Sequence, residues 1–404
     1  MRISSETGMY EPVVDEKKCI DCGLCEQVCP MRFVDLTKLS RRVFGRLPED
    51  PYVGTVRAVY VGHATDEGLR YQAASGGVAT VLISKAIEDG LIDGALLVRM
   101  NNRRPILPEP FIAKSPSEVK EAMGSKYCPV PINALLRYVI NSDGVFAMTT
   151  TPCQMLGLRK AEELIDGLKE RIRLHIGLFC NHMVNFYGTS LILYKMGVEP
   201  REVVKLAWRS RGWPGGMTIW LRNGREVFCD LHYYMTFVNP FIFTPMACLI
   251  CPDATNELAD ISLGDAWHMP EVTGQRSPGF SIVVVRTRLG EELLASATEE
   301  GLIKLIEIDR ALLVYSKRSQ LRFKKKALLA KRRMLTHIFE TKDVPDLKPV
   351  RPLTPALRDW LATTMALIAV RLSKPTLFGV FSKLPYMLYR VYHAMFYKVV
   401  GGSP

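Results

Sequence analysis

Over residues 56–196, short apolar runs alternate with segments whose apolar residues recur at helical spacing. Short, mostly apolar runs predict buried strands at residues 56–62, 95–100, 145–148 and 173–178. Segments with apolar positions at helical spacing predict helices at residues 75–89, 154–163 and 186–196. Because strands that alternate with helices commonly build a parallel sheet, this part of the chain predicts an α/β core.

The pattern changes beyond residue 200. Two alternating segments, at residues 217–222 and 225–228, flank Asn223-Gly224, a dipeptide typical of tight hairpins. Further strands are expected at residues 260–264 and 281–286, with a helix at residues 291–299. Four prolines between residues 345 and 355 then predict a linker, followed by an apolar, aromatic helical tail. The predicted fold is α/β, with a small ferredoxin-like N-terminal segment, a mixed α/β core and a helical C-terminal tail.

Near the N-terminus, four cysteines lie within eleven residues and are followed by proline: Cys19, Cys22, Cys25 and Cys29. Their spacing is that of bacterial ferredoxins, whose thiolates surround a [4Fe-4S] cluster. Zinc sites usually stop at paired C-x2-C units, and disulfide scaffolds rarely crowd four cysteines so closely. In two-cluster ferredoxins the fourth cysteine ligates the other cluster, so the distant Cys128, also followed by proline, is an alternative to Cys29.

Four further cysteines form a second predicted metal site. Cys153 and Cys180 each follow a predicted strand, and the carboxyl ends of parallel strands meet at one edge of a sheet. The pair Cys248-x2-Cys251 would complete a four-thiolate site. The alternative is that Cys153 and Cys180 are small buried hydrophobic residues and that the C-x2-C pair binds zinc. A second redox centre is favoured because an electron relay needs one, and Cys128 and Cys229 are then ordinary thiols.

A glycine-rich turn is the candidate site for an organic cofactor. Iron–sulfur clusters carry single electrons and cannot accept a hydride, so a flavin is the expected converter. Residues 74–80 open a predicted helix, where unpaired N–H groups and glycines suit a phosphate or a flavin pyrimidine edge. The same turn is also typical of a simple helix cap. Residues 124–127 add a lysine charge and an aromatic ring, and the Rossmann G-x-G-x-x-G fingerprint is absent.

Seven short motifs in this order carry a resemblance to a known family. They are Ser75-Gly76-Gly77-Val78, Gly90-Leu-Ile-Asp93-Gly94-Ala95, Gly124-Ser125-Lys126-Tyr127, Thr151-Pro152-Cys153-Gln154, Gly177-Leu178-Phe179-Cys180, Cys248-x2-Cys251 with Asp253, and Leu258-Ala-Asp-Ile-Ser-Leu-Gly-Asp265. Over residues 55–335 the chain resembles the beta subunits of coenzyme F-420-reducing hydrogenases and their relatives. The N-terminal ferredoxin segment is shared with many members, but the tail after residue 335 lies outside the resemblance.

The resemblance implies FAD, an inner [4Fe-4S] cluster on Cys153, Cys180, Cys248 and Cys251, and redox chemistry on a deazaflavin coenzyme. With the N-terminal segment, the expected cofactors are two [4Fe-4S] clusters and FAD. The candidate flavin-binding residues are Ser75, Gly76, Gly77, Val78, Thr80, Ser125, Lys126, Tyr127 and Thr151. No acid–base role is assigned to His63 or His175.

The leading hypothesis is an oxidoreductase that passes electrons between reduced coenzyme F-420 and a one-electron acceptor, either ferredoxin or a partner redox subunit. One rival is a ferredoxin-dependent reductase of another organic substrate on the same flavin. The other is a non-catalytic electron-transfer subunit of a larger complex. The expected regions are a ferredoxin-type segment (1–50), a flavin-binding region (51–140), a region with the second cluster (141–335) and a linker with a helical tail (336–404).

The net charge of +12 is concentrated in one predicted helix at residues 317–333. Such a basic run most often forms a solvated face, although an acidic partner or an anionic membrane would also suit it. No nucleic-acid-binding signature accompanies it. The N-terminus lacks the apolar region of a signal peptide and most cysteines are assigned as ligands, so a cytoplasmic location is expected.

The tail at residues 356–400 leaves three alternatives. Its uncharged run at residues 361–370 is well short of the roughly 20 residues that span a bilayer. A helix packed on its own domain, a contact with a partner subunit, and a peripheral helix at the inner face of the membrane all remain open.

Overall fold

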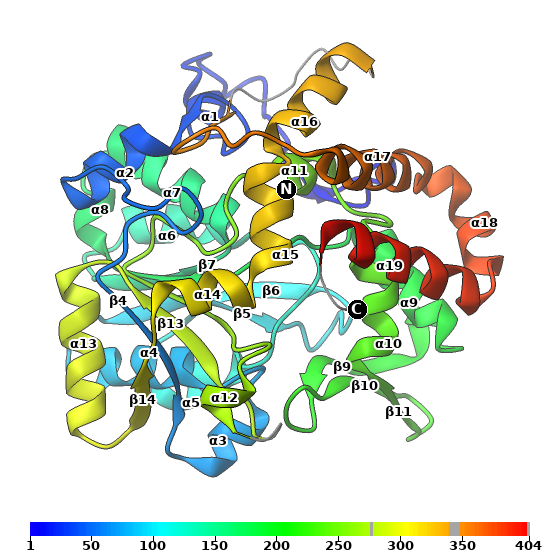
Figure 1. The fold of residues 1–404 in the computed structure, drawn as a ribbon. Helices are drawn as coiled ribbons and strands as arrows, with labels where there is room; N and C mark the ends of the chain where they lie inside the picture. Colours follow the sequence, from blue (N-terminus) through cyan, green and yellow to red (C-terminus); the bar gives the residue numbers. More distant parts are fainter. Residues whose placement is uncertain (275–277, 339–346, 402–404) are drawn as a thin grey trace.

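The centre of the computed structural model, which describes residues 1–274, 278–338 and 347–401, is an eight-stranded mixed sheet (Figure 1). Its strand order is β14-β4-β13-β12-β8-β7-β5-β6. The strands are β4 (Ala58–Ala64), β5 (Gly94–Met100), β6 (Pro108–Ala113), β7 (Phe146–Thr150), β8 (Ile172–Leu178), β12 (Ile261–Asp265), β13 (Ser281–Val285) and β14 (Ile303–Glu307). Strands β5, β7, β8 and β12 are mutually parallel, and antiparallel strands flank them on both sides. The predicted α/β core is therefore confirmed.

Helices cover both faces of this sheet, which explains why its central strands read as continuous apolar runs. All five residues of β13 are buried, and one core joins the sheet to the helices α4 (Val78–Glu88) and α13 (Arg288–Glu299). The other helices of this part are α3 (Glu67–Gln72), α5 (Pro116–Glu121), η1 (Ile132–Leu135), α6 (Leu136–Ile140), α7 (Pro152–Leu164), α8 (Leu168–Arg171), α9 (Phe186–Lys195), α12 (Pro270–Thr273) and α14 (Arg310–Ser316).

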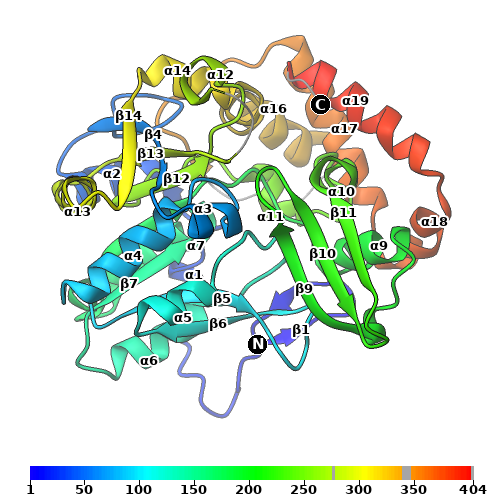
Figure 2. The same ribbon diagram turned by 90° about the horizontal axis from the view of Figure 1, so that it is seen from below.

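A separate three-stranded antiparallel sheet stands beside the main one, as Figure 2 shows. It consists of β9 (Val203–Ser210), β10 (Gly216–Leu221) and β11 (Glu226–Asp230), and β9 follows the short helix η2 (Pro200–Glu202). Strands β10 and β11 form the hairpin predicted around Asn223-Gly224, and Gly224 has the positive φ of 82° that this turn needs. Helix α10 (Leu231–Val238) then leads back towards the core.

The N-terminal segment contains β1 (Arg2–Ile3), β2 (Tyr10–Glu11), α1 (Leu24–Gln27), β3 (Val34–Asp35) and α2 (Leu36–Phe44). Its first hairpin is held by α9, because Asn185 Nδ2 donates to Thr7 O at 2.8 Å and Tyr187 Oη donates to Ser5 O at 2.6 Å. The strand β15 (Leu347–Lys348), which follows residues outside the described ranges, pairs in parallel with β3. The linker region therefore returns to the ferredoxin-type segment before the tail begins.

The basic run does not form the single solvated helix that was expected. It comprises α15 (Arg318–Leu321), the π-helical turn η3 (Arg322–Lys326), α16 (Leu328–Arg333) and the π-helical turn η4 (Met334–Ile338). Four of its lysines are buried, namely Lys317, Lys324, Lys325 and Lys331. The solvated-face prediction is wrong for these four. Three of the ammonium groups face carbonyl oxygens or a carboxylate from other parts of the fold, and that of Lys331 lies over the ring of Phe323 within the run itself.

The tail forms α17 (Leu357–Leu372), η5 (Pro375–Leu377), α18 (Phe378–Lys383) and α19 (Tyr386–Val400), which line one side of the molecule in Figures 1 and 2. Its inner residues Ala366, Leu367 and Phe396 belong to the large core that also contains α10. Packing on the protein's own domain is thus confirmed for this face. Within the described ranges no single helix is long and apolar enough to cross a membrane. Helix α17 and residues Pro375–Lys383 are long and apolar enough when taken together, but the chain bends by 80° between them.

Candidate functional site: two cysteine groups and a glycine turn

The first cysteine group comes entirely from one exposed segment around the single turn of α1. Cys19, Cys22 and Cys25 are exposed and Cys29 is half-buried. Gly23, which precedes α1, has a φ of 70°, a left-handed conformation that glycine adopts without strain. This local curl is what the ferredoxin spacing predicts.

The alternative ligand Cys128 lies elsewhere, in the main core. Burial raises the pKa of its thiol to about 12, which is typical of an inert structural cysteine. Cys229 is also buried in that core, and burial raises its pKa to about 12 as well. The placement therefore favours Cys29 over Cys128 as the fourth ligand of the N-terminal site.

The second cysteine group is assembled from three separate segments. Cys153 lies in the first turn of α7, directly after β7, and Cys180 follows β8, the parallel neighbour of β7. Cys248 lies in the short helix α11 (Met246–Ile250), and Cys251 ends it. The four thiols are close enough to interact. Burial and, to a smaller extent, the neighbouring Cys153 and Cys251 raise the pKa of Cys180 to about 12, although Lys324 opposes them. Burial also raises the pKa of Cys248, as do Cys180 and Cys153.

Within the described ranges, no three His, Cys, Asp or Glu side chains are arranged to hold a single metal ion. The chemistry of the donor set is nonetheless specific, because the group contains four thiols, and iron–sulfur clusters are held by four cysteine thiolates.

The loop after Cys251 is held rigidly by polar contacts that explain two of the sequence motifs. The Asp253 carboxylate accepts hydrogen bonds from the backbone N–H groups of residues 255, 256 and 257 at 2.8–2.9 Å. Asn256 Nδ2 donates to Thr150 O at 2.8 Å, which ties this loop to the end of β7. A Cβ on Gly177 would lie 2.6 Å from the Asn256 side chain, so only glycine leaves room for it.

Two buried lysines from the basic run face the inner cysteine group. Lys324 Nζ donates to Asp253 O at 2.8 Å, and the same oxygen accepts a contact from Cys251 Sγ at 3.5 Å. Burial opposes the charge of Lys324, but Cys251, Cys180 and Cys248 raise its pKa overall. Lys331 is fully buried, with its Nζ 3.7 Å from the centroid of the Phe323 ring and no hydrogen-bond partner among the described residues. Burial and the neighbouring Lys324 lower the pKa of Lys331 although Cys251 raises it, so its charged form needs a further negative charge nearby.

A buried cation is costly unless an opposite charge compensates it. Lys324 and Lys331 therefore suit an anionic occupant of the cysteine site, and a cluster bound by four thiolates is anionic. The residues present thus fit an iron–sulfur cluster, and they provide a reason for the burial of two lysines that the sequence alone placed in solvent.

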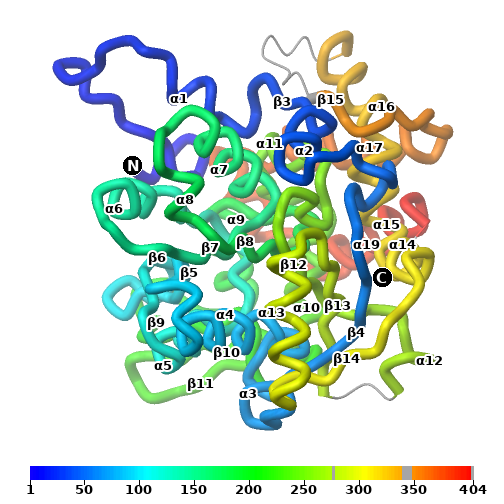
Figure 3. The backbone as a smooth tube through the Cα atoms, turned by 90° about the vertical axis from the view of Figure 1, so that its left-hand side faces the viewer, coloured from blue at the N-terminus to red at the C-terminus, as the bar shows by residue number. Residues whose placement is uncertain are grey.

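Helix α7 connects the two cysteine groups. Cys153 lies in its first turn, and Lys160, two turns later, donates from Nζ to Cys29 O at 2.8 Å and to Arg32 O at 2.7 Å. Between them, a Cβ on Gly157 would lie 3.5 Å from Val28 O, so the N-terminal segment packs directly on this helix (Figure 3). Cys153 and Gly157 are separated by about 6 Å along the helix axis. The two predicted clusters are therefore neighbours.

The glycine turn before α4 is required by packing within the protein. A Cβ on Gly76 would lie 2.4 Å from Gly62 O in β4, and one on Gly77 would lie 2.5 Å from the Leu69 side chain. Gly77 also has a φ of 80° and provides no side-chain cap for α4, whereas α3, α5, α9 and α13 are all capped by side chains. The N–H groups of the first turn of α4 are therefore open to an external acceptor, as a flavin or phosphate would provide.

Sequence reasoning missed Arg209, which connects three of the family motifs. Its Nη2 donates to Ala74 O at 2.5 Å, and its Nη1 donates to Tyr127 Oη at 3.1 Å and to Asp265 Oδ2 at 3.2 Å. Burial opposes its charge, yet Tyr127 and Asp265 raise the pKa of Arg209 overall. The only sequence signal was an arginine at the end of a half-buried strand, which does not reveal partners 56 to 135 residues away.

Two tryptophans extend this region. The rings of Trp213 and Trp267 lie 4.6 Å apart between centroids, and Trp213 packs against Gly279 beside the backbone of Ser75. The glycine turn, Tyr127, Arg209, Asp265 and these two rings therefore form one continuous group around the start of α4.

The remaining candidates have structural contacts of their own. Lys126 Nζ donates to three backbone carbonyls, those of Val98, Ala122 and Met123, and burial lowers its pKa to about 7. Thr151 N donates to Gln154 Oε1 at 3.0 Å at the start of α7, and Thr151 Oγ1 contacts Cys153 Sγ at 3.5 Å. Val78 is buried, whereas Thr80 and Ser125 are half-buried.

The two histidines that received no role in catalysis are held by local contacts. His175 is buried between Glu162 Oε1 at 2.6 Å and Asp260 Oδ2 at 3.1 Å. His63 Nδ1 contacts Ala64 O at 2.8 Å. These contacts hold both imidazole rings in place.

Comparison with known proteins matches three family models to this chain. Residues 59–137 match the N-terminal part and residues 144–311 the C-terminal part of the coenzyme F-420 hydrogenase/dehydrogenase beta subunit. Residues 12–35 match the 4Fe-4S binding domain and include Cys19, Cys22, Cys25 and Cys29. The two beta-subunit matches lie inside the regions 51–140 and 141–335 expected from the sequence.

Among curated proteins, the coenzyme F-420 hydrogenase subunit beta of Methanothermobacter thermautotrophicus is 29% identical over 64% of this chain and 86% of its own length. One of the subunits of the F-420H2 dehydrogenase of Methanosarcina mazei is 24% identical over 74% of this chain and 76% of its own length. The coenzyme F-420-dependent sulfite reductase of Methanocaldococcus jannaschii is 25% identical over 75% of this chain and 50% of its own length.

The fold also matches a solved structure. One chain of the F-420-reducing [NiFe] hydrogenase complex of Methanosarcina barkeri superposes with a TM-score of 0.56, at 23% identity, covering 75% of this chain and 98% of that one. At this identity the likeness supports the fold alone. Taken together with the ordered motifs, the two beta-subunit matches show that this chain belongs to the coenzyme F-420 hydrogenase/dehydrogenase beta-subunit family and carries an N-terminal 4Fe-4S binding domain.

Proposed function

We propose that this protein is an iron–sulfur flavoenzyme that passes electrons between reduced coenzyme F-420 and a one-electron acceptor, through FAD and two [4Fe-4S] clusters. The acceptor is a ferredoxin or a partner redox subunit, as the hydrogenase and dehydrogenase subunits among its relatives suggest. The observation that carries the proposal is the pair of cysteine groups that α7 connects, the inner one close to two buried lysines.

The inner cluster would be held by Cys153, Cys180, Cys248 and Cys251, and the outer one by Cys19, Cys22, Cys25 and Cys29. Lys324 and Lys331 offset part of the negative charge of the inner site, and the Asp253 loop keeps Cys251 in place. Lys160 fixes the backbone of Cys29 against α7. These contacts keep the two sites at a short, constant separation, which a relay of single electrons requires.

FAD would lie at the open first turn of α4, near Thr80 and the group formed by Tyr127, Arg209 and Asp265. When bound, the flavin supplies the conversion between a hydride and single electrons. Arg209 holds the carbonyl of Ala74 and so fixes the turn that aims the N–H groups of α4. Gly76 and Gly77 let this turn lie close to β4, so their substitution should disturb the protein's own packing as well as cofactor binding.

The test is anaerobic stopped-flow mixing of the protein, reconstituted with iron, sulfide and FAD, with reduced coenzyme F-420. We expect the flavin absorbance to bleach first and the broad iron–sulfur absorbance to follow within the same turnover. Reduction by reduced ferredoxin only would instead support a ferredoxin-dependent reductase of another organic substrate. A reconstituted protein that binds no flavin would show a non-catalytic electron-transfer subunit.

A further inference from the structure

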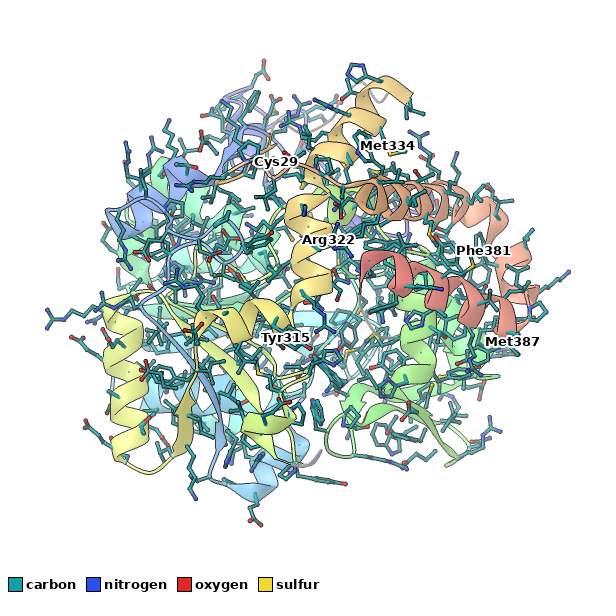
Figure 4. All side chains as sticks on the ribbon, in the orientation of Figure 1. Cys29, Tyr315, Arg322, Met334, Phe381 and Met387 are labelled. Carbon is teal, nitrogen blue, oxygen red and sulfur yellow. The ribbon has the colours of Figure 1, made fainter. Side chains whose placement is uncertain are left out.

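The outward face of the tail is unusually apolar. Among the described residues, ten large apolar side chains of this tail are exposed: Leu357, Leu361, Ile368, Leu372, Leu377, Val380, Met387, Leu388, Val391 and Met395. Leu357 is 76% exposed and Met387, which Figure 4 shows at the outer edge of the molecule, is 62% exposed. We call these ten residues and the basic residues among them the outer face of the tail.

The exposed residues form stripes, not scattered positions. On α17, Leu357, Leu361, Ile368 and Leu372 fall within about 60° of one another around the helix axis. On α19, Met387, Leu388, Val391 and Met395 span about 100°. The two helices lie side by side, because Tyr392 Oη of α19 donates to Met365 O of α17 at 2.7 Å.

The charge on this face has one sign. Between residues 356 and 401 the sole acidic residue is Asp359, and it is buried in a bidentate ion pair with Arg322 at 2.7 and 2.9 Å. The exposed charged residues of the tail are all basic: Arg358, Arg371, Lys374, Lys383, Arg390 and Lys398. No acidic side chain of the described tail therefore meets solvent.

The opposite face of the same helices is anchored in the core. Tyr389, Phe396 and Ala366 are buried there, and Lys195 Nζ donates to the carbonyls of Ser382 and Leu384 at 2.7 and 2.6 Å. The tail is thus a fixed element of the fold with a second, unpartnered face. Truncation after Pro355 would expose this core, so it cannot test the outer face by itself.

We propose that the outer face of the tail binds the surface of an anionic lipid bilayer. Large apolar side chains interspersed with lysine and arginine suit the boundary between headgroups and acyl chains. A protein partner is less well matched, because lysine is depleted from the cores of protein interfaces, whereas three exposed lysines of the tail, Lys374, Lys383 and Lys398, accompany its apolar residues. The proposal extends beyond the proposed redox function and does not depend on it.

The experiment is sedimentation of the full-length, reconstituted protein with phosphatidylcholine vesicles, with and without an equal share of phosphatidylglycerol. We expect at least tenfold stronger binding to the anionic vesicles, weakened by 1 M salt because the charges are exposed. The triple variant Leu388→Gln, Val391→Gln and Met395→Gln should lose at least tenfold in binding. A second variant, Lys383→Glu with Arg390→Glu, should lose anionic selectivity.

A matched control replaces three exposed apolar residues outside the tail, Ile140, Val204 and Ile306, with glutamine and should bind like the wild type. Iron content and far-ultraviolet circular dichroism confirm that each variant is folded. Equal sedimentation of the triple variant and the wild type would overturn the proposal. The proposal would also be overturned if the wild type does not bind anionic vesicles and light scattering shows a dimeric wild type and a monomeric triple variant. The outer face of the tail would then join two copies of the chain.

Discussion

The two cysteine groups each contain four thiols, but they are assembled in different ways. The N-terminal group comes from eleven consecutive residues on an exposed loop, whereas the inner group is assembled from α7, the end of β8 and α11. The first could form in an isolated peptide because its geometry is local. The second exists only once the parallel sheet and the basic run have folded around it. We therefore expect the two sites to differ in their coupling to stability and in their redox properties.

The largest expected effect comes from breaking the inner site. Cys153→Ser should reduce the iron content of anaerobically reconstituted protein from about eight to about four atoms per chain. It should also lower the melting temperature, because Lys324 and Lys331 then remain buried beside an incomplete site. Iron analysis and calorimetry measure both. Cys229→Ser is the matched control, and a Cys153→Ser protein with full iron content would refute the assignment.

Breaking the outer site should remove the same amount of iron with little loss of stability. Cys29→Ser should retain about four iron atoms per chain and a near-normal melting temperature, since its loop is exposed. Cys128→Ser should keep both clusters, because that thiol lies in the apolar core. If instead Cys128→Ser loses iron and Cys29→Ser does not, the fourth ligand has been misassigned.

The buried charge of Lys324 should give the two clusters different reduction potentials. Lys324→Met removes a cation beside Cys251 and should shift the reduction equilibrium of the inner cluster at least tenfold towards the oxidised form, about 59 mV for a one-electron couple. Redox titration followed by electron paramagnetic resonance measures this shift. The Lys324→Arg variant keeps the positive charge and should retain most of the wild-type potential. The Lys195→Met variant, which removes a carbonyl-bound lysine elsewhere, should leave both potentials unchanged.

The smallest effect concerns the contact between the two sites. Lys160→Met removes two hydrogen bonds from an ammonium group to Cys29 O and Arg32 O, at a cost of about 1–3 kcal/mol to the docking of the segment. Limited proteolysis should then cut residues 12–35 faster, with unchanged iron content. Lys169→Met, on the neighbouring α8, is a control for loss of charge alone. Equal cleavage rates would show that Lys160 does not hold this segment.

Much of the fold was predictable because its signals are local. Each segment expected between residues 56 and 196 matches a strand or helix to within a few residues, and the hairpin at Asn223-Gly224 forms as the turn chemistry requires. The shorter elements of the same region, α3, β6, α5, α6 and α8, were not predicted. The basic run was misjudged because helical periodicity carries no information on distant partners. Lys324 and Lys331 look like surface residues until the segment with Cys251 and Asp253 is folded against them.

The candidate site divides in the same way. The sequence by itself determined the family, the ferredoxin-type segment and which cysteines are available, because residue type and spacing carry that chemistry. Only the tertiary structure decided that α7 connects the two cysteine groups, that Arg209 joins the glycine turn to Tyr127 and Asp265, and that the tail has one buried and one exposed face. These features depend on contacts between residues far apart in the chain, and such contacts form only when burial of the shared core places the segments together.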